Sequence, residues 1–204
     1  MNYTLEEIKS IVQALKETNP WVSNHVKDIK QRIKSNHLNK VTPKCCYCLR
    51  DFTGEFRYDI DIEHILPKSK YKYCIFDLEN LSIACKRCNM KLKNDKVNFL
   101  AIDLLTTYGK WKTKYFNSNY YYFVHPNLDN VYEHLRIVNS RVDDLNFKKY
   151  FPVDNSEKGR FTYDYFELNE LESDSLTQIQ GSIVAEPKSE LAKDIAEVLK
   201  KHGF

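Results

Sequence analysis

The chain has 204 residues, of which 42% are hydrophobic and 29% charged, and its formal net charge at pH 7 is +3. This composition, with only five glycines and six prolines, excludes collagen and an intrinsically disordered chain. A mean hydropathy of −0.57 and the lack of an apolar run of about 18 residues exclude a membrane span. With no secretory signal pattern at its start, we expect a cytoplasmic protein, whose six cysteines are metal ligands or buried thiols rather than disulfides.

Two amphipathic helices are predicted at the start of the chain. Thr4 and Glu7 match a capping box, and apolar residues then recur at helical spacing until the break at Pro20. A second apolar stripe, with lysines on another face, follows and ends before Pro43. We therefore interpret residues 1–40 as a helical arm.

Charge is unevenly distributed along the sequence. Residues 24–50 contain seven Lys or Arg against one Asp, and residues 86–114 contain eight against two acids. Residues 154–174 compensate, because seven acids there face two basic residues. Two basic segments that bracket one stretch indicate a polyanion site, although a single run of lysines is more commonly a solvated surface.

Four cysteines form two C-x-x-C pairs: Cys45, Cys48, Cys85 and Cys88. Structural Zn²⁺ is held tetrahedrally by four such ligands, and two matched pairs are hard to explain as unrelated core thiols. The sequence therefore predicts a structural zinc site. Cys46 and Cys74 lie outside the pattern, with the alternative that Cys46 replaces Cys45 as a ligand.

The segment between the cysteine pairs carries the other polar candidates. Residues 59–63 alternate acidic and apolar side chains, which predicts a strand with its acids on one face and its isoleucines buried. His64 follows Glu63 directly, Asn80 lies in a later loop, and Asn89 opens a basic helix after the second cysteine pair. A lone histidine is usually structural, and it is the presence of these neighbours that favours a functional role for His64.

This arrangement resembles the HNH endonucleases, which have a ββα-metal core and flanking zinc knuckles. The resemblance covers about residues 45–96 and is carried by Glu-His-Ile-Leu-Pro-Lys-Ser at 63–69, by Asn80-Leu81, and by the run from Cys85 to Lys93. More weakly, Pro-x-Leu-Asp at 126–129 and Lys-Gly-x-x-Thr at 158–162 resemble HNH proteins of bacterial anti-phage systems such as Septu and some retrons.

The resemblance implies an α+β fold in three parts. The helical arm, residues 1–40, would precede a zinc-stapled ββα-metal module over residues 41–100. An α/β region, residues 101–204, would shape the binding of substrate or partner. Within it, strands are predicted at Leu135–Val138 and Phe161–Tyr165.

The resemblance also implies a metal-dependent endonuclease that hydrolyses phosphodiester bonds, with DNA as the favoured nucleic acid. His64 is the candidate general base. Asn80 would shape the loop opposite His64 and so help to orient the histidine ring. Glu63 and Asn89 would bind one Mg²⁺ or Mn²⁺. Many members carry Asp in place of Glu63 and His in place of Asn89, so metal preference is not assigned. Asp61 either adds a further acid near the metal or faces solvent.

Nucleic-acid contacts are expected from lysines beside these motifs. Lys68, Lys91 and Lys93 are the candidates for neutralising phosphates. Aromatic residues between Trp111 and Phe123, interleaved with lysines, either stack on unpaired bases or, more commonly, pack in a core.

Two more segments carry structural predictions. Tyr120–Phe123 is predicted as a strand, and Pro187–Lys201 as a closing helix.

Two other functions compete with a stand-alone enzyme. A non-catalytic zinc module that binds nucleic acid or a partner protein would keep the cysteines without needing the four polar candidates together, so the enzyme is favoured. A defence subunit would cut only beside an ATPase partner, with the acidic segment 154–174 as its docking surface. No membrane partner is expected.

Overall fold

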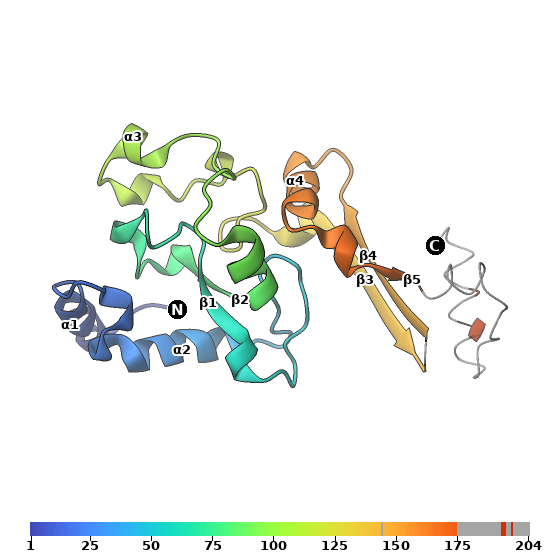
Figure 1. Cartoon of the computed structure of the whole chain (residues 1–204), viewed down its shortest axis with the longest axis horizontal. Helices are drawn as coiled ribbons and strands as arrows, with labels where there is room; N and C mark the ends of the chain where they lie inside the picture. The colour runs from blue at the N-terminus through green and yellow to red at the C-terminus, as the bar shows by residue number, and fades with distance from the viewer. Residues whose placement is uncertain (144, 175–192, 195–196, 198–204) are drawn as a thin grey trace. The chain divides into compact units, whose positions relative to one another are not determined.

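The computed structural model describes residues 1–143, 145–174, 193–194 and 197 (Figure 1). The chain divides into two compact units, Met1–Val131 and Tyr132–Phe204. Helices and antiparallel strands are both present, so the α+β class is confirmed. The three-part division stays a prediction, and its boundary between residues 100 and 101 falls within the first unit. Within the described residues, none of the helices has the length and apolar character that crossing a membrane requires.

The two predicted helices of the arm are present as α1 (Leu5–Ala14) and α2 (Lys27–Leu38). Thr4 begins α1 as a capping box, because its side chain accepts a hydrogen bond from the Glu7 N–H and its own N–H donates to the Glu7 carboxylate. The same carboxylate accepts from Arg32 Nε at 2.5 Å, which ties α1 to α2.

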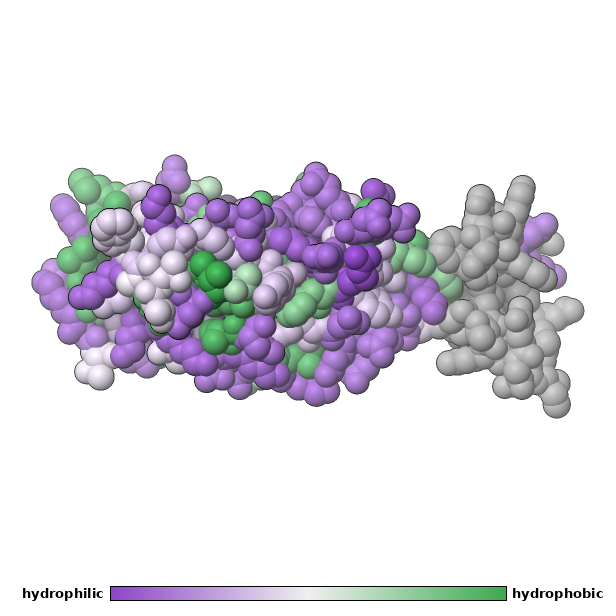
Figure 2. Space-filling model, turned by 90° about the horizontal axis from the view of Figure 1, so that it is seen from above, coloured by the Kyte–Doolittle hydropathy of each residue, from purple (hydrophilic) through white to green (hydrophobic). Residues whose placement is uncertain are grey.

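The apolar stripe of α1 is only partly used in the core. Ile11 and Ala14 are buried, whereas four apolar residues on the adjoining face stay exposed: Leu5, Ile8, Val12 and Leu15. Such exposed apolar side chains are the exception in the view of Figure 2, where hydrophilic residues cover most of the described surface and hydrophobic ones form small groups.

The predicted ββα module is present and packs on the arm. Strands β1 (Ile60–His64) and β2 (Leu81–Cys85) are antiparallel, with Ile62 opposite Ile83, and a π-helical segment, Arg87–Lys93, follows β2. α2 contacts both strands. The shared core consists of Ile11, Ala14, Val26, Ile29, Ile33, Ile75, Phe76 and Leu81. Burial of these side chains holds the arm against the hairpin.

The aromatic stretch Tyr120–Phe123 is not a strand, contrary to prediction. Ser118–Tyr120 forms a 3₁₀ turn, and only an isolated bridge joins Tyr121 to Leu100. The aromatic side chains explain the difference, since Tyr121 and Phe123 both pack on the buried ring of Phe99. Core packing therefore determines this segment, in place of pairing along a sheet. A short helix, α3 (Leu104–Tyr108), follows Phe99.

The second unit contains a three-stranded antiparallel sheet in the order β3 (Leu135–Val142), β4 (Leu145–Pro152) and β5 (Ser173–Asp174). The strand predicted from Leu135 is therefore confirmed. The strand predicted over Phe161–Tyr165 is wrong, because these residues complete α4 (Glu157–Tyr165).

Capping explains that error. The Ser156 side chain accepts a hydrogen bond from the Gly159 N–H at 2.9 Å and begins a helix, in which Phe161 and Tyr165 stack at i and i+4. The predicted closing helix, Pro187–Lys201, lies almost entirely outside the described residues.

Gly159 of α4 lies so close to the backbone of His134 that there is no room for a side chain. A Cβ at this position would lie 1.9 Å from the His134 carbonyl oxygen. We expect Gly159→Ala to destabilise the second unit by roughly 1–3 kcal/mol through overpacking, despite the better helix propensity of alanine. Hydrogen exchange of the β3, β4 and α4 amides measures the loss. Arg160→Ala, at the exposed neighbour, is the control, and equal protection in both variants would contradict the steric argument.

Candidate metal centre and catalytic cleft

The four cysteines of the two C-x-x-C pairs meet in one buried cluster. Their Sγ atoms all lie within 4.8 Å of one another, and Cys48 Sγ is 3.8 Å from Cys85 Sγ. Four sulfurs about 2.3 Å from a tetrahedral Zn²⁺ are separated by about 3.8 Å, so the cluster fits this ion. Hydrogen bonds from Cys45 and the other sulfurs lower the pKa values of the Cys48 and Cys85 thiols, whereas burial raises the pKa of the Cys45 thiol, so zinc binding would release a proton there.

Cys45, rather than Cys46, belongs to the cluster. The alternative in which Cys46 replaces it is therefore wrong. The Cys45 sulfur accepts a hydrogen bond from the Cys85 N–H at 3.4 Å, which places it beside the second cysteine pair. The next residue, Cys46, instead donates its backbone N–H to the Ile83 carbonyl of β2.

Glu63 is fully buried, whereas Ile62, an isoleucine predicted to be buried, is half-buried and lines the cleft. Lys93 Nζ lies 2.8 Å from Glu63 Oε1, and the Tyr47 hydroxyl donates to the same oxygen at 2.9 Å. Burial raises the pKa of the Glu63 carboxyl, and the Lys93 ammonium opposes that shift. Because both donors engage Oε1, the other carboxylate oxygen is left for a ligand in the cleft that Glu63 lines.

Lys93 thus has a different environment from the exposed phosphate contact that was predicted. Its side chain is 1% exposed, and besides Glu63 its ammonium donates to the His64 carbonyl at 2.8 Å. The π-helical segment accounts for this position, since its i→i+5 bond from Asn94 N to Asn89 O adds a residue to the turn that ends at Lys93.

His64 ends β1 with its ring at the bottom of a cleft. Nε2 lies 3.1 Å from the Ile75 carbonyl oxygen, an acceptor that places the proton on Nε2 and leaves the Nδ1 lone pair free. Trp21 of the arm packs edge-on against the ring, with centroids 4.3 Å apart. Burial, followed by the charge of Lys68, lowers the pKa of His64 to about 3, so the imidazole is neutral.

Asn80 is buried and fastens the loop that faces His64. Its Oδ1 accepts from the Leu66 N–H at 2.7 Å, and its Nδ2 donates to the carbonyls of Leu66 and Cys74, each at 3.1 Å. Since Ile75, the partner of the histidine ring, directly follows Cys74, the amide fixes the carbonyl that orients His64.

Asn89 is positioned by Asp61. The amide Nδ2 donates to Asp61 Oδ2 at 3.0 Å, and Lys86 lies 3.3 Å from the other oxygen of that carboxylate. Asp61 is half-buried and contacts the site through Asn89. This arrangement commits the NH₂ group and leaves the amide oxygen as the free ligand atom of Asn89.

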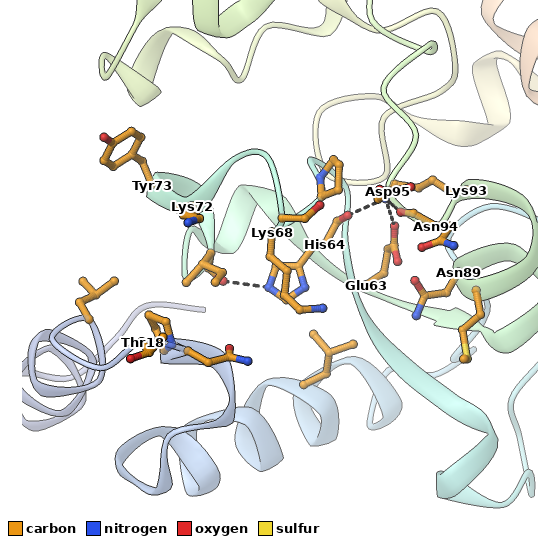
Figure 3. A pocket seen from close by; sticks show the side chains of 18 of the residues that line it. Thr18, Glu63, His64, Lys68, Lys72, Tyr73, Asn89, Lys93, Asn94 and Asp95 are labelled. Carbon is orange, nitrogen blue, oxygen red and sulfur yellow. Dashed lines mark hydrogen bonds and ion pairs between the residues drawn. The ribbon is translucent and has the colours of Figure 1, made fainter.

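These side chains line one cleft of about 1100 Å³ (Figure 3). Glu63, His64 and Asn89 lie on the ββα module, and Lys68 is exposed above the histidine. Lys91 is also exposed but lies outside the lining. The structure therefore brings together the predicted metal ligands and base, with one of the three predicted phosphate-binding lysines accessible beside them.

Three contributors to the site were missed from the sequence: Trp21, Tyr47 and Lys72. Tyr47 lies inside the first cysteine pair and Trp21 follows the break at Pro20, so neither is among the residues that carry the resemblance. Only Lys72 had a signal, its place in the lysine-rich loop after Pro67.

Comparison with known proteins agrees with this geometry. Residues 45–95 match the family of HNH endonucleases. The chain is 39% identical over 62 residues to the Septu protein PtuB of Bacillus thuringiensis, and this similarity spans 30% of the chain but only 24% of PtuB. No solved structure matches the chain significantly. Residues 45–95 are thus an HNH endonuclease domain with a cysteine cluster of the kind that holds zinc.

The cluster predicts which cysteine substitutions release zinc. We expect wild-type protein to hold about one Zn²⁺ per chain and Cys45→Ser to lose it, because a tetrahedral site with three thiolates retains the ion poorly. Metal analysis of purified protein measures the ratio. Cys46→Ser, one residue away, is the matched control and should keep its zinc. Zinc loss from both variants, or from neither, would refute the ligand assignment.

Proposed function

We propose that the chain is a metal-dependent HNH endonuclease that hydrolyses phosphodiester bonds of DNA as part of a bacterial defence system. The observation that carries this proposal is the meeting of Glu63, His64 and Asn89 in one cleft of an HNH domain. The similarity to a Septu protein supports the defence role. Structural Zn²⁺ on the four cysteines would hold the module together.

His64 serves as the general base. Its Nδ1 lone pair would accept a proton from the water that attacks phosphorus, while the hydrogen bond to Ile75 holds the ring in the required tautomer. A base with a strongly lowered pKa takes a proton poorly on its own. The negative charge of a bound phosphodiester offsets the nearby lysine charge, and so raises the basicity of His64 when substrate is present.

Glu63 and Asn89 would hold the catalytic Mg²⁺ or Mn²⁺ through their free oxygens. When bound, this ion supplies positive charge to the leaving oxygen of the phosphodiester. The protein prepares for it by holding Glu63 from one side through Tyr47 and Lys93, and Asn89 through Asp61. These contacts fix both ligands before any ion arrives, which lowers the cost of ordering them.

The alternative of a non-catalytic zinc module explains less of the structure. A module that only binds would have no need of a buried carboxylate, a tautomer-fixing contact to His64 and an oriented amide beside one another. The similarity covers about a quarter of PtuB, so it does not by itself identify a partner. A partner ATPase is therefore part of the proposal for the defence system.

The base assignment predicts a selective loss of rate. We expect His64→Ala to lower the cleavage rate of plasmid or oligonucleotide DNA about 10²- to 10⁴-fold, because the group acts in the transition state. Zinc content and DNA affinity should change little. His37→Ala, on α2, is the control and should cleave at the wild-type rate. A His64→Ala protein with wild-type activity would exclude His64 as the base.

We expect one substitution to change the metal dependence of cleavage and another to change the salt dependence of DNA binding. Cleavage should require added Mg²⁺ or Mn²⁺, and Asn89→Ala should raise the half-saturating metal concentration by about tenfold or more. Lys68→Ala should instead flatten the log-log salt dependence of DNA binding by about 0.7 to 0.9, the contribution of one phosphate. Titrations of rate with metal and of affinity with salt measure the two effects. An Asn89→Ala variant with an unchanged metal response would contradict the ligand assignment.

A further inference from the structure

The cleft has two walls from segments far apart in the sequence. One wall is the ββα module with the loop that follows β1, and the other is the arm segment that joins α1 to α2. The arm contributes Leu15, Glu17, Thr18, Asn19 and Pro20 to the lining. Figure 3 shows Thr18 on the arm side of the cleft and Lys72 and Tyr73 on the loop.

His64 lines this cleft and is otherwise buried. His64 is 6% exposed, and Trp21 of the arm packs against its ring in a T-shaped contact. A scissile phosphate must therefore descend between the walls to meet Nδ1. In a duplex, each phosphate lies on a stiff double helix beside the second strand, so a single strand fits between the two walls more readily than a duplex does.

The size of the cleft agrees with a single strand. Its volume, about 1100 Å³, is close to the upper size of small-molecule pockets, roughly 300–1,000 Å³. Such a space accommodates a few nucleotides of one strand.

The loop wall carries a stacking surface beside cations. Tyr73 lines the cleft and is 49% exposed, although its neighbour Cys74 is buried and anchors the turn. Lys110 Nζ, from the segment after α3, lies 5.7 Å from the Tyr73 ring centroid, and the exposed Lys68 and Lys72 belong to the same loop as Tyr73. Base stacking on an aromatic ring next to lysines is the usual way of binding single strands without reading their sequence.

Charge alone does not account for strand binding here. Glu17 and Asp95 also line the cleft and offset part of its lysine charge. Binding of a strand therefore also needs contacts to its bases, and only unpaired bases are free to stack on Tyr73.

We propose that the cleft takes unpaired, single-stranded DNA, with a base stacked on Tyr73 and flanking phosphates at Lys68 and Lys72. This inference rests on the proposed nuclease function and narrows its substrate. It assigns the arm a role in selection: the segment Leu15–Trp21 closes the side from which a duplex would otherwise approach His64.

A binding experiment without catalysis tests the proposal. Full-length wild-type protein, with its zinc and without added Mg²⁺ or Mn²⁺, is titrated into fluorescein-labelled 12-nucleotide DNA, either single-stranded or as the duplex of the same sequence. Anisotropy at one fixed salt concentration gives both affinities. We expect the single strand to bind about tenfold more tightly or better. Equal affinities, or a preference for the duplex, would overturn the proposal.

Substitutions then locate the contact. Tyr73→Ala should weaken single-strand binding about fivefold or more, the lower limit for one lost base stack, while Tyr73→Phe keeps wild-type affinity. Tyr122→Ala is the matched control, since Tyr122 is also 49% exposed but lies outside the cleft lining. Equal losses from Tyr73→Ala and Tyr122→Ala, or no loss from either, would overturn the role of Tyr73.

Cleavage of the same oligonucleotides with Mg²⁺ or Mn²⁺ separates this inference from the function on which it rests. Faster cleavage of the single strand supports both. Duplex cleavage at an equal or higher rate overturns the inference and leaves the nuclease standing. Single-strand binding with no cleavage of either substrate supports the cleft assignment and overturns a nuclease that acts without a partner.

Discussion

The cluster of four sulfurs is the constraint on which the rest of the nuclease module depends. It joins a knuckle before β1 to another that begins at the last residue of β2, where Cys85 pairs with Ile60, so one centre holds one end of a two-stranded sheet that is too small to be stable alone. The chain between Cys48 and Cys85 contains Glu63, His64 and Asn80, and Asn89 follows the last ligand directly. Every candidate catalytic residue therefore lies in the chain between the two cysteine pairs or directly after the second pair.

Within that frame, the site is organised around a buried charge pair. A carboxylate removed from water is costly unless it is paired and hydrogen-bonded, and Glu63 meets both conditions through Lys93 and Tyr47. The same ammonium also reaches the His64 carbonyl, so one side chain links the acid and the base. Lys93 is thus a structural element of the site, and removing it would leave a buried carboxylate without its cation.

Sequence reasoning identified what depends on spacing and missed what depends on packing. The cysteine pairs and β1 follow from short-range patterns and are present in the structure, and His64 and Asn89, which the same patterns single out, line one cleft. By contrast, the burial of Lys93 depends on one extra residue in a π-helical segment, and Tyr120–Phe123 follows packing on Phe99 rather than strand propensity. Phe161–Tyr165 has a β-like composition, yet the cap at Ser156 and its contact with Gly159 make it helical. Such outcomes are decided by tertiary contacts, which a local pattern does not contain.

The contact between Trp21 and His64 has an experimental consequence. The chain has two tryptophans, and the other, Trp111, is 73% exposed and lies outside the cleft lining. An indole packed against the imidazole in the cleft senses the polarity of its surroundings, whereas an exposed one is already in water. The intrinsic fluorescence of this protein therefore has a water-exposed background from Trp111 and a signal from the indole that contacts His64, and a single Trp111→Phe change would isolate an optical reporter of the surroundings of His64 that needs no attached dye.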